Sequence, residues 1–91
     1  MSKEYYTEGT AIRITDSLEI SDPDSVVVTI KNPSGGVVVN GVAMTLEAQG
    51  KYYYIYQSHL GDPLGEYTVI TSVSRGGETS VVRNTFTLQA Q

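Results

Sequence analysis

Apolar and polar residues alternate in several short stretches of this chain, and no other feature limits its fold as strongly. In the segment SVVVTIK, Val26, Val28 and Ile30 fall on one side, with Val27, Thr29 and Lys31 on the other. The segments TAIRIT, EYTVITSVS and SVVRNTFTLQ repeat the pattern and are rich in Val, Ile, Thr and Tyr. Because successive side chains of a strand point to opposite faces, this period of two predicts half-buried β-strands.

Turn-forming residues separate these stretches at intervals of roughly 8–12 residues, the spacing expected of an all-β sandwich or barrel. The Gly76-Gly77 pair predicts a tight hairpin, because glycine accepts the positive φ that two-residue hairpin turns require. Asn40-Gly41 is a second turn signal and interrupts a run of valines. We therefore expect an all-β fold, an antiparallel sandwich of about seven strands. The expected strands cover residues 10–15, 25–31, 37–40, 43–47, 51–58, 66–74 and 78–88.

The length of 91 residues is that of one domain, so we expect a single domain over 1–91 with a short N-terminal arm, 1–8. The inward positions of the expected strands define a candidate core. Its members are Ile12, Ile14, Val26, Val28, Ile30, Leu46, Tyr67, Val69, Val73, Val82 and Phe86.

Composition and charge argue against several classes of function. The net charge is -4, and the six basic residues are scattered, so we expect no nucleic-acid partner. There is no cysteine, which excludes disulfides and thiolate zinc sites. No apolar run approaches the length of a membrane helix, and the first ten residues do not resemble a secretory signal. We expect no signal peptide and no membrane insertion.

The segment KYYYIYQS is the most aromatic part of the chain, and two interpretations of it stay open: packing inside the fold, or a contact surface. Alternation places Tyr52, Tyr54 and Tyr56 on one face and Tyr53 and Ile55 on the other. Because three hydroxyl groups each need a partner or water, we expect Ile55 to face the core and the three tyrosines to lie outside. A row of exposed rings would be a protein-interaction surface.

The segment DPLGEYTVIT resembles the E–F corner of immunoglobulin-like (Ig-like) domains. In such corners a tyrosine hydroxyl hydrogen-bonds to nearby backbone, which implies this role for Tyr67 after Gly65. Val69 stands where antibody domains have their second cysteine, and the chain has no tryptophan. The resemblance therefore implies a structural corner in an Ig-like domain that is not of the antibody type.

A wider resemblance, from about Tyr6 to Leu88, is to bacterial and viral Ig-like modules of the macroglobulin and phage virion types. It rests on the phrases YTEGTAIRI, DPDSVVVTIKNPSGG and LGEYTV. The resemblance implies a non-enzymatic structural or assembly protein, with a phage or prophage virion accessory subunit (decoration, adaptor, neck or tail) as the leading version. It would dock on other protein subunits, in the virion or in the cytoplasm before assembly.

The alternative is an Ig-like recognition module that binds a carbohydrate or a protein. Sugar binders stack rings on aromatic side chains, and Tyr52, Tyr54 and Tyr56 with Gln57 are the residues that could serve. We expect no other small-molecule ligand.

No residue pattern predicts catalysis or a cofactor. His59 is the only histidine, and the chain lacks the Gly-x-Ser-x-Gly elbow of serine hydrolases. The acidic residues Asp16, Glu19, Asp22 and Asp24 stand in turn-forming contexts, where aspartate caps backbone amides. A weak calcium site at Glu19, Asp22 and Asp24 stays open as an alternative, because calcium prefers clustered oxygen ligands. We expect no enzyme activity, cofactor or metal.

Overall fold

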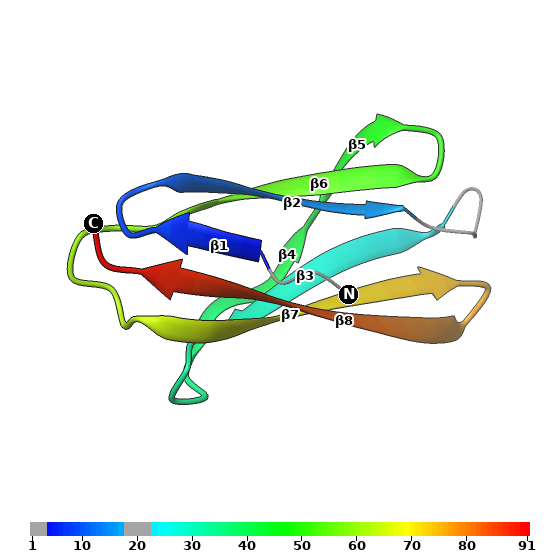
Figure 1. Cartoon of the computed structure of the whole chain (residues 1–91). Helices are drawn as coiled ribbons and strands as arrows, with labels where there is room; N and C mark the ends of the chain where they lie inside the picture. Colours follow the sequence, from blue (N-terminus) through cyan, green and yellow to red (C-terminus); the bar gives the residue numbers. More distant parts are fainter. Residues whose placement is uncertain (1–3, 18–22) are drawn as a thin grey trace.

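A computed structural model of the chain describes residues 4–17 and 23–91, and in these residues every regular element is a β-strand (Figure 1). This confirms the all-β class. The strands are β1 (Glu4–Thr7), β2 (Ala11–Ser17), β3 (Ser25–Lys31), β4 (Val37–Ala43), β5 (Thr45–Ala48), β6 (Lys51–Gln57), β7 (Gly65–Arg75) and β8 (Glu78–Gln89).

The strands form two sheets that lie one above the other in Figure 1, an arrangement compatible with a β-sandwich. The five-stranded sheet has the order β1-β8-β7-β3-β4, and the three-stranded sheet has the order β2-β6-β5. All neighbours are antiparallel except β1, which pairs in parallel with residues 86–89 of β8. Strand β1 lies in the segment that we expected to be an arm.

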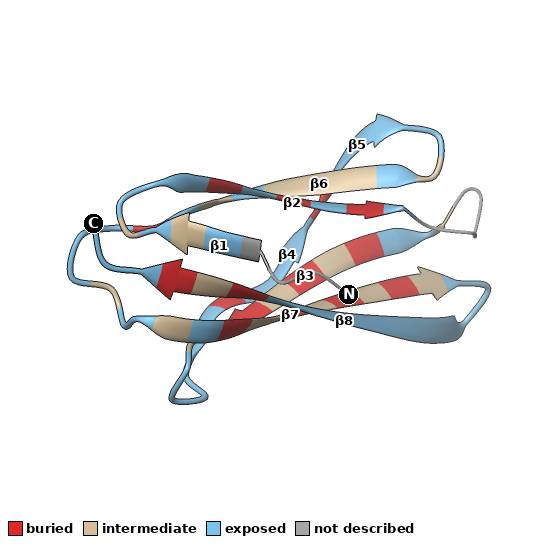
Figure 2. Cartoon of the chain, in the orientation of Figure 1, coloured by how far each residue is buried: buried red, intermediate tan, exposed pale blue. Residues whose placement is uncertain are grey.

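The core lies between the two sheets and confirms most of the expected residues (Figure 2). Val39, Met44 and Leu88 are additional members. The buried hydrophobic residues are Ile12, Ile14, Val26, Val28, Ile30, Val39, Met44, Tyr67, Val69, Val73, Phe86 and Leu88.

The expected burial is wrong for two residues of the candidate core, and both lie at a sheet edge. Leu46 is 59% exposed, and the edge strand β5 contributes no buried side chain. Val82 is 40% exposed. The short strand β1 covers only the end of β8, so the first part of β8 remains an uncovered edge.

The Asn40-Gly41 pair is a bulge within β4 and not the expected turn. Val42 pairs with Val28 and Val39 pairs with Ile30, so two residues of β4 stand opposite Thr29 alone. Gly41 has φ of 61°, and its N–H donates to the Thr29 hydroxyl at 3.1 Å. The chain then changes sheets at the buried Met44, whose N–H donates to the Val26 carbonyl at 2.9 Å.

The expected hairpin at Gly76-Gly77 is confirmed. Both glycines have positive φ, 59° and 83°, and the flanking Arg75 and Glu78 pair with each other. The Asp24 carboxylate accepts a hydrogen bond from the Gly76 N–H at 2.9 Å, so this acidic residue caps a turn as expected.

Candidate interaction surface

The tyrosines of β6 face the core, and the expectation that they face outward is wrong. Tyr52, Tyr54 and Tyr56 pack against the buried cluster, whereas Ile55 is 44% exposed. The register with β2 gives the reason: Tyr54 stands opposite Ile14, and directly opposed residues share a face. The inward isoleucines of β2 therefore fix the inward position of the rings, which removes the premise for an interaction surface at these tyrosines.

The outward side of the three-stranded sheet carries a charged pair. The Arg13 guanidinium lies 4.0 Å from the centre of the Tyr53 ring and also pairs with the Glu47 carboxylate. One cation thus covers the outward ring and links β2, β6 and β5. These contacts give Arg13, Tyr53 and Glu47 partners within the chain itself.

Tyr67 forms the expected corner. Its hydroxyl donates to the Pro63 carbonyl at 2.7 Å, which confirms the contact that the sequence predicts. Gly65 has φ of 127°, and a Cβ there would lie 3.2 Å from Pro33, so both conformation and space favour glycine.

An aromatic cluster surrounds this corner and joins both sheets. The Tyr67 ring stacks on Phe86 at 5.0 Å, and Tyr56 lies 6.2 Å from each of these rings. Tyr6 of β1 and Phe86 form a T-shaped pair with their ring centroids 6.0 Å apart. Burial, followed by the nearby Tyr56 and Asp62, raises the pKa of Tyr67 to about 12. Burial is also the main cause that raises the pKa of Tyr56, with Asp62 and Tyr54 adding to it.

Asp16 lies inside the fold, and its expected place in a turn is wrong. It is a buried residue of β2, and its carboxylate accepts hydrogen bonds from the Thr71 hydroxyl and from the Asn84 amide at 3.2 Å. These bonds join β2 to β7 and β8 across the core. They satisfy the carboxylate, as a buried charge requires, and we assign Asp16 a structural role.

The remaining candidate groups occupy turns. His59 is exposed in the β6–β7 loop, where its backbone N–H donates to the Asp62 carboxylate at 2.7 Å. Glu19 and Asp22 lie outside the described residues, so the calcium alternative stays untested. Among the residues that are described, no three His, Cys, Asp or Glu side chains gather as a metal site requires.

The outward side of the five-stranded sheet carries few charges at its centre. Its centre, which we call the outer face, consists of three rows across β8, β7 and β3. The rows are Val81–Ser72–Val27, Arg83–Ile70–Thr29 and Thr85–Thr68–Lys31. Most of these side chains are short and β-branched, and the only charges among them are the cations of Lys31 and Arg83.

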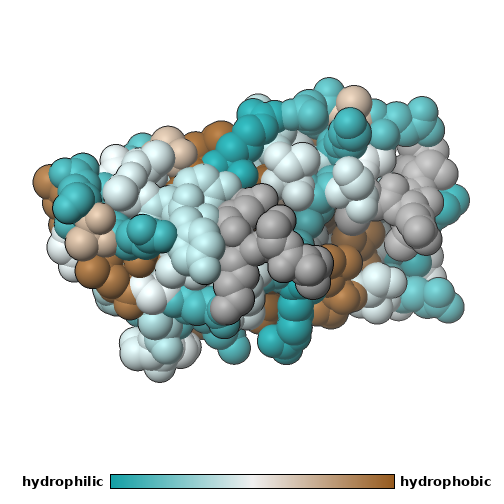
Figure 3. Space-filling view, viewed as in Figure 1, coloured by the Kyte–Doolittle hydropathy of each residue, from teal (hydrophilic) through white to brown (hydrophobic). Residues whose placement is uncertain are grey.

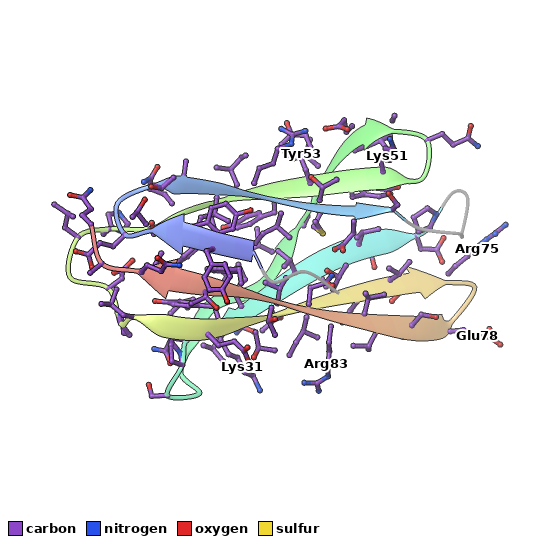
Figure 4. All side chains as sticks on the ribbon, in the orientation of Figure 1. Lys31, Lys51, Tyr53, Arg75, Glu78 and Arg83 are labelled. Atoms are coloured by element: carbon purple, nitrogen blue, oxygen red, sulfur yellow. The ribbon has the colours of Figure 1, made fainter. Side chains whose placement is uncertain are left out.

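Lys31 and Arg83 project from the same side of this sheet, away from the three-stranded sheet (Figure 4). Neither side chain has a hydrogen bond or ion pair to another described residue. Alternation in the sequence already placed Thr29 and Lys31 together. It could not show that β7 and β8 follow β3 in the sheet, the order that places Arg83 on the same face as Lys31.

In the view of Figure 1, the hydrophobic surface is divided into separate patches. Figure 3 shows it at the left end, where the β6–β7 loop turns, and right of centre at the level of β8. In the β6–β7 loop the exposed apolar residues are Leu60 and Leu64.

Comparisons with known proteins give no family for this chain: no protein-family model matches it, and no curated protein matches it. In the parts of the chain that the structure covers, 4–17 and 23–91, no helix has the length and hydrophobicity to cross a membrane.

Proposed function

We propose that this chain is a non-enzymatic Ig-like structural subunit that docks on a larger protein assembly, with a phage or prophage virion as the leading setting. The observation that carries the docking role is the outer face. A mostly uncharged sheet surface with two cations that pair with no other described residue suits contact with an acidic protein surface. The remainder of the chain is acidic overall, so the cations distinguish this face from its surroundings.

The strand orders support the Ig-like part of the proposal. In Ig-like sandwiches, strands B, E and D form one sheet, and G, F and C form the other. The orders β2-β6-β5 and β8-β7-β3 correspond to these, with β4 added beside β3. The Tyr67 hydrogen bond at the start of β7 is the corner expected before strand F. The pairing of β1 with β8 departs from domains whose first strand joins the B strand.

The setting in a virion rests on the sequence resemblance to phage Ig-like modules. The alternative of a carbohydrate-binding module relied on exposed rings at Tyr52, Tyr54 and Tyr56. These rings pack against the core, so they do not form a surface on which a sugar could stack. Gln57, the amide of that alternative, donates to the Ser58 carbonyl at 2.9 Å. A protein ligand remains compatible with the outer face.

Sedimentation of the tagged chain in lysates of its native host tests the proposal. The wild-type chain should sediment with particles much heavier than its own 9.9 kDa. The double variant Lys31→Glu/Arg83→Glu should remain at the top of the gradient. It places two carboxylates opposite the acidic surface of the partner, and these like charges repel. Lys51→Glu/Arg75→Glu changes the net charge equally at positions away from the outer face and should sediment like wild type (Figure 4).

Two outcomes would reject this function. One is a wild-type chain that sediments at its own mass, and the other is equal loss of sedimentation in both double variants. Specific binding of the isolated chain to an array of glycans would favour the recognition module instead.

A further inference from the structure

The bulge in β4 places the dipeptide Asn40-Gly41 on the outermost strand of the five-stranded sheet. The register with β3 pairs neither residue, and both are exposed. The Asn40 side chain makes no hydrogen bond to another described residue. A Cβ at Gly41 would meet no atom within 4 Å, so the backbone here has free space around it. The carboxamide carbon of Asn40 is therefore open to attack by the backbone nitrogen that follows it.

We propose that Asn40 is a site of spontaneous covalent modification, at which the carboxamide becomes aspartate or isoaspartate through a cyclic imide. The Gly41 nitrogen forms a bond to the Asn40 Cγ. Its proton is taken up, through solvent, by the side-chain nitrogen, which leaves as ammonia. Water then opens the imide at either of its two carbonyl carbons. This inference does not depend on the proposed function, which concerns the outer face.

Glycine after the asparagine makes this attack feasible. The attacking nitrogen must turn toward the preceding side chain, and glycine has no Cβ to obstruct that approach. Gly41 already has φ of 61°, a conformation that few other residues adopt. Because the dipeptide lies in a bulge, the peptide between Asn40 and Gly41 can rotate without breaking the strand pairs on either side.

The chain has two other asparagines, and the first of them cannot react in this way. Asn32 precedes Pro33, whose nitrogen carries no hydrogen to give up. Its carboxamide oxygen is also held in the turn, where it accepts hydrogen bonds from the N–H groups of Ser34 and Gly36 at 3.1 and 2.8 Å.

The second of these asparagines, Asn84, is held in the sheet. It lies in the regular ladder between β7 and β8, and its amide donates to the Asp16 carboxylate at 3.2 Å. The residue after it is Thr85, whose branched side chain crowds the nitrogen that would attack. The surroundings of the three asparagines therefore select Asn40 as the reactive one.

One side chain of β3 restrains the bulge. The Gly41 N–H donates to the Thr29 hydroxyl at 3.1 Å, which holds the attacking nitrogen toward β3 and away from the Asn40 side chain. This hydrogen bond must open before the nitrogen can attack. A hydrogen bond of ordinary net strength changes such an opening equilibrium by about fivefold. We therefore expect the rate to follow local opening of the bulge and not unfolding of the domain.

Modification adds a charge to a part of the chain that has none. The stretch from Asn32 to Leu46 contains no Asp, Glu, Lys or Arg, and either product adds one carboxylate to a chain of net charge -4. Isoaspartate also lengthens the backbone of β4. The bulge already holds an extra residue, so it is the place where this strand can accept the added length.

Incubation of the folded chain in mildly alkaline buffer, followed by intact-mass measurement and tandem mass spectrometry of its peptides, tests the proposal. Wild type should gain the mass that replaces an amide by a carboxyl, with aspartate and isoaspartate located at Asn40. Asn40→Gln keeps a carboxamide on a longer side chain and should stop this gain. The matched variant Asn84→Gln should be modified at the wild-type rate.

Two further variants separate local opening from global unfolding. Thr29→Val keeps the side-chain shape without the hydroxyl and should speed the reaction about fivefold. Leu88→Ala removes a buried side chain from β8, which β7 and β3 separate from β4. It should raise the unfolded fraction more than about thirtyfold and leave the rate at Asn40 unchanged.

Several results would overturn the proposal. One is a folded chain that keeps Asn40 intact over many half-lives of a peptide of residues 37–43, and another is faster modification at Asn32 or Asn84. A rate that rises in Leu88→Ala as its stability falls would place the reaction in the unfolded chain and reject the folded bulge as the site. An unchanged rate in Thr29→Val would reject the bulge in the same way.

Discussion

At the scale of single residues, Tyr67 connects the sequence, the corner and the core. Its ring is fully buried against Phe86, and its hydroxyl is bound to the Pro63 carbonyl. Tyr67→Phe keeps the ring and removes the hydroxyl, which leaves that carbonyl without this donor. We expect a loss of about 1 kcal/mol in the free energy of unfolding, measured by denaturant titration. An unchanged denaturation midpoint would show that the Tyr67 hydrogen bond does not stabilise the corner.

The raised pKa of Tyr67 makes stability depend on pH in the alkaline range. The folded state holds the phenol proton up to a pKa of about 12, whereas the unfolded chain loses it near the usual value of 10.0. This contribution to stability is complete below pH 10 and is lost as the pH rises through 12. The decrease is at most about 1.4 kcal/mol per pH unit.

Urea denaturation of wild type and Tyr67→Phe at several alkaline pH values measures this dependence. The variant has no phenol at this position, so its stability should fall less steeply above pH 10. Parallel curves for the two proteins would show that Tyr67 does not contribute to the alkaline loss.

At the scale of strands, sequence patterns predicted faces well only where one face is clearly apolar. In β3, Val26, Val28 and Ile30 leave no choice of inward face, and the structure agrees. In β6 both faces are apolar, and the choice depends on which residues of β2 stand opposite. Register is set between strands distant in the sequence, so alternation within β6 could not supply it.

The same limit explains the misplaced core residues and the missed surface. Leu46 has an inward pattern, but its burial depends on whether the opposite sheet covers that end of the strand, and the local sequence does not show this. The corner at Gly65 and the hairpin at Gly76-Gly77 were predictable because a few adjacent residues determine them. The outer face was not, because it joins β3 to the distant strands β7 and β8.

The orientation of β6 gives a direct test by paired substitutions. Tyr54→Ser removes a ring that packs against the core and should lower the free energy of unfolding by about 2–4 kcal/mol. Ile55→Ser changes an outward side chain of the same strand and should lower it by less than about 1 kcal/mol. Equilibrium denaturation measures both values. A larger loss for Ile55→Ser would mean that the strand has the opposite orientation.

At the scale of the whole molecule, several links bind the two sheets into one unit. Tyr56 of the three-stranded sheet contacts Tyr67 and Phe86 of the five-stranded sheet. Asp16 makes a second link through its hydrogen bonds to Thr71 and Asn84. Since neither sheet has a separate core, partial unfolding of one would expose the inner face of the other.

We therefore expect the chain to unfold in one cooperative step. Thermal unfolding followed by far-ultraviolet circular dichroism reports the strands, and near-ultraviolet circular dichroism reports the tyrosines. The two signals should change at the same temperature. Val28→Ala removes fully buried atoms from the middle of β3 and should cost about 1–3 kcal/mol. It should lower both transitions together, because the disturbed contacts belong to the shared core. Separate transitions in either protein would mean that the sheets fold independently, and the links at Tyr56 and Asp16 would then be too weak to couple them.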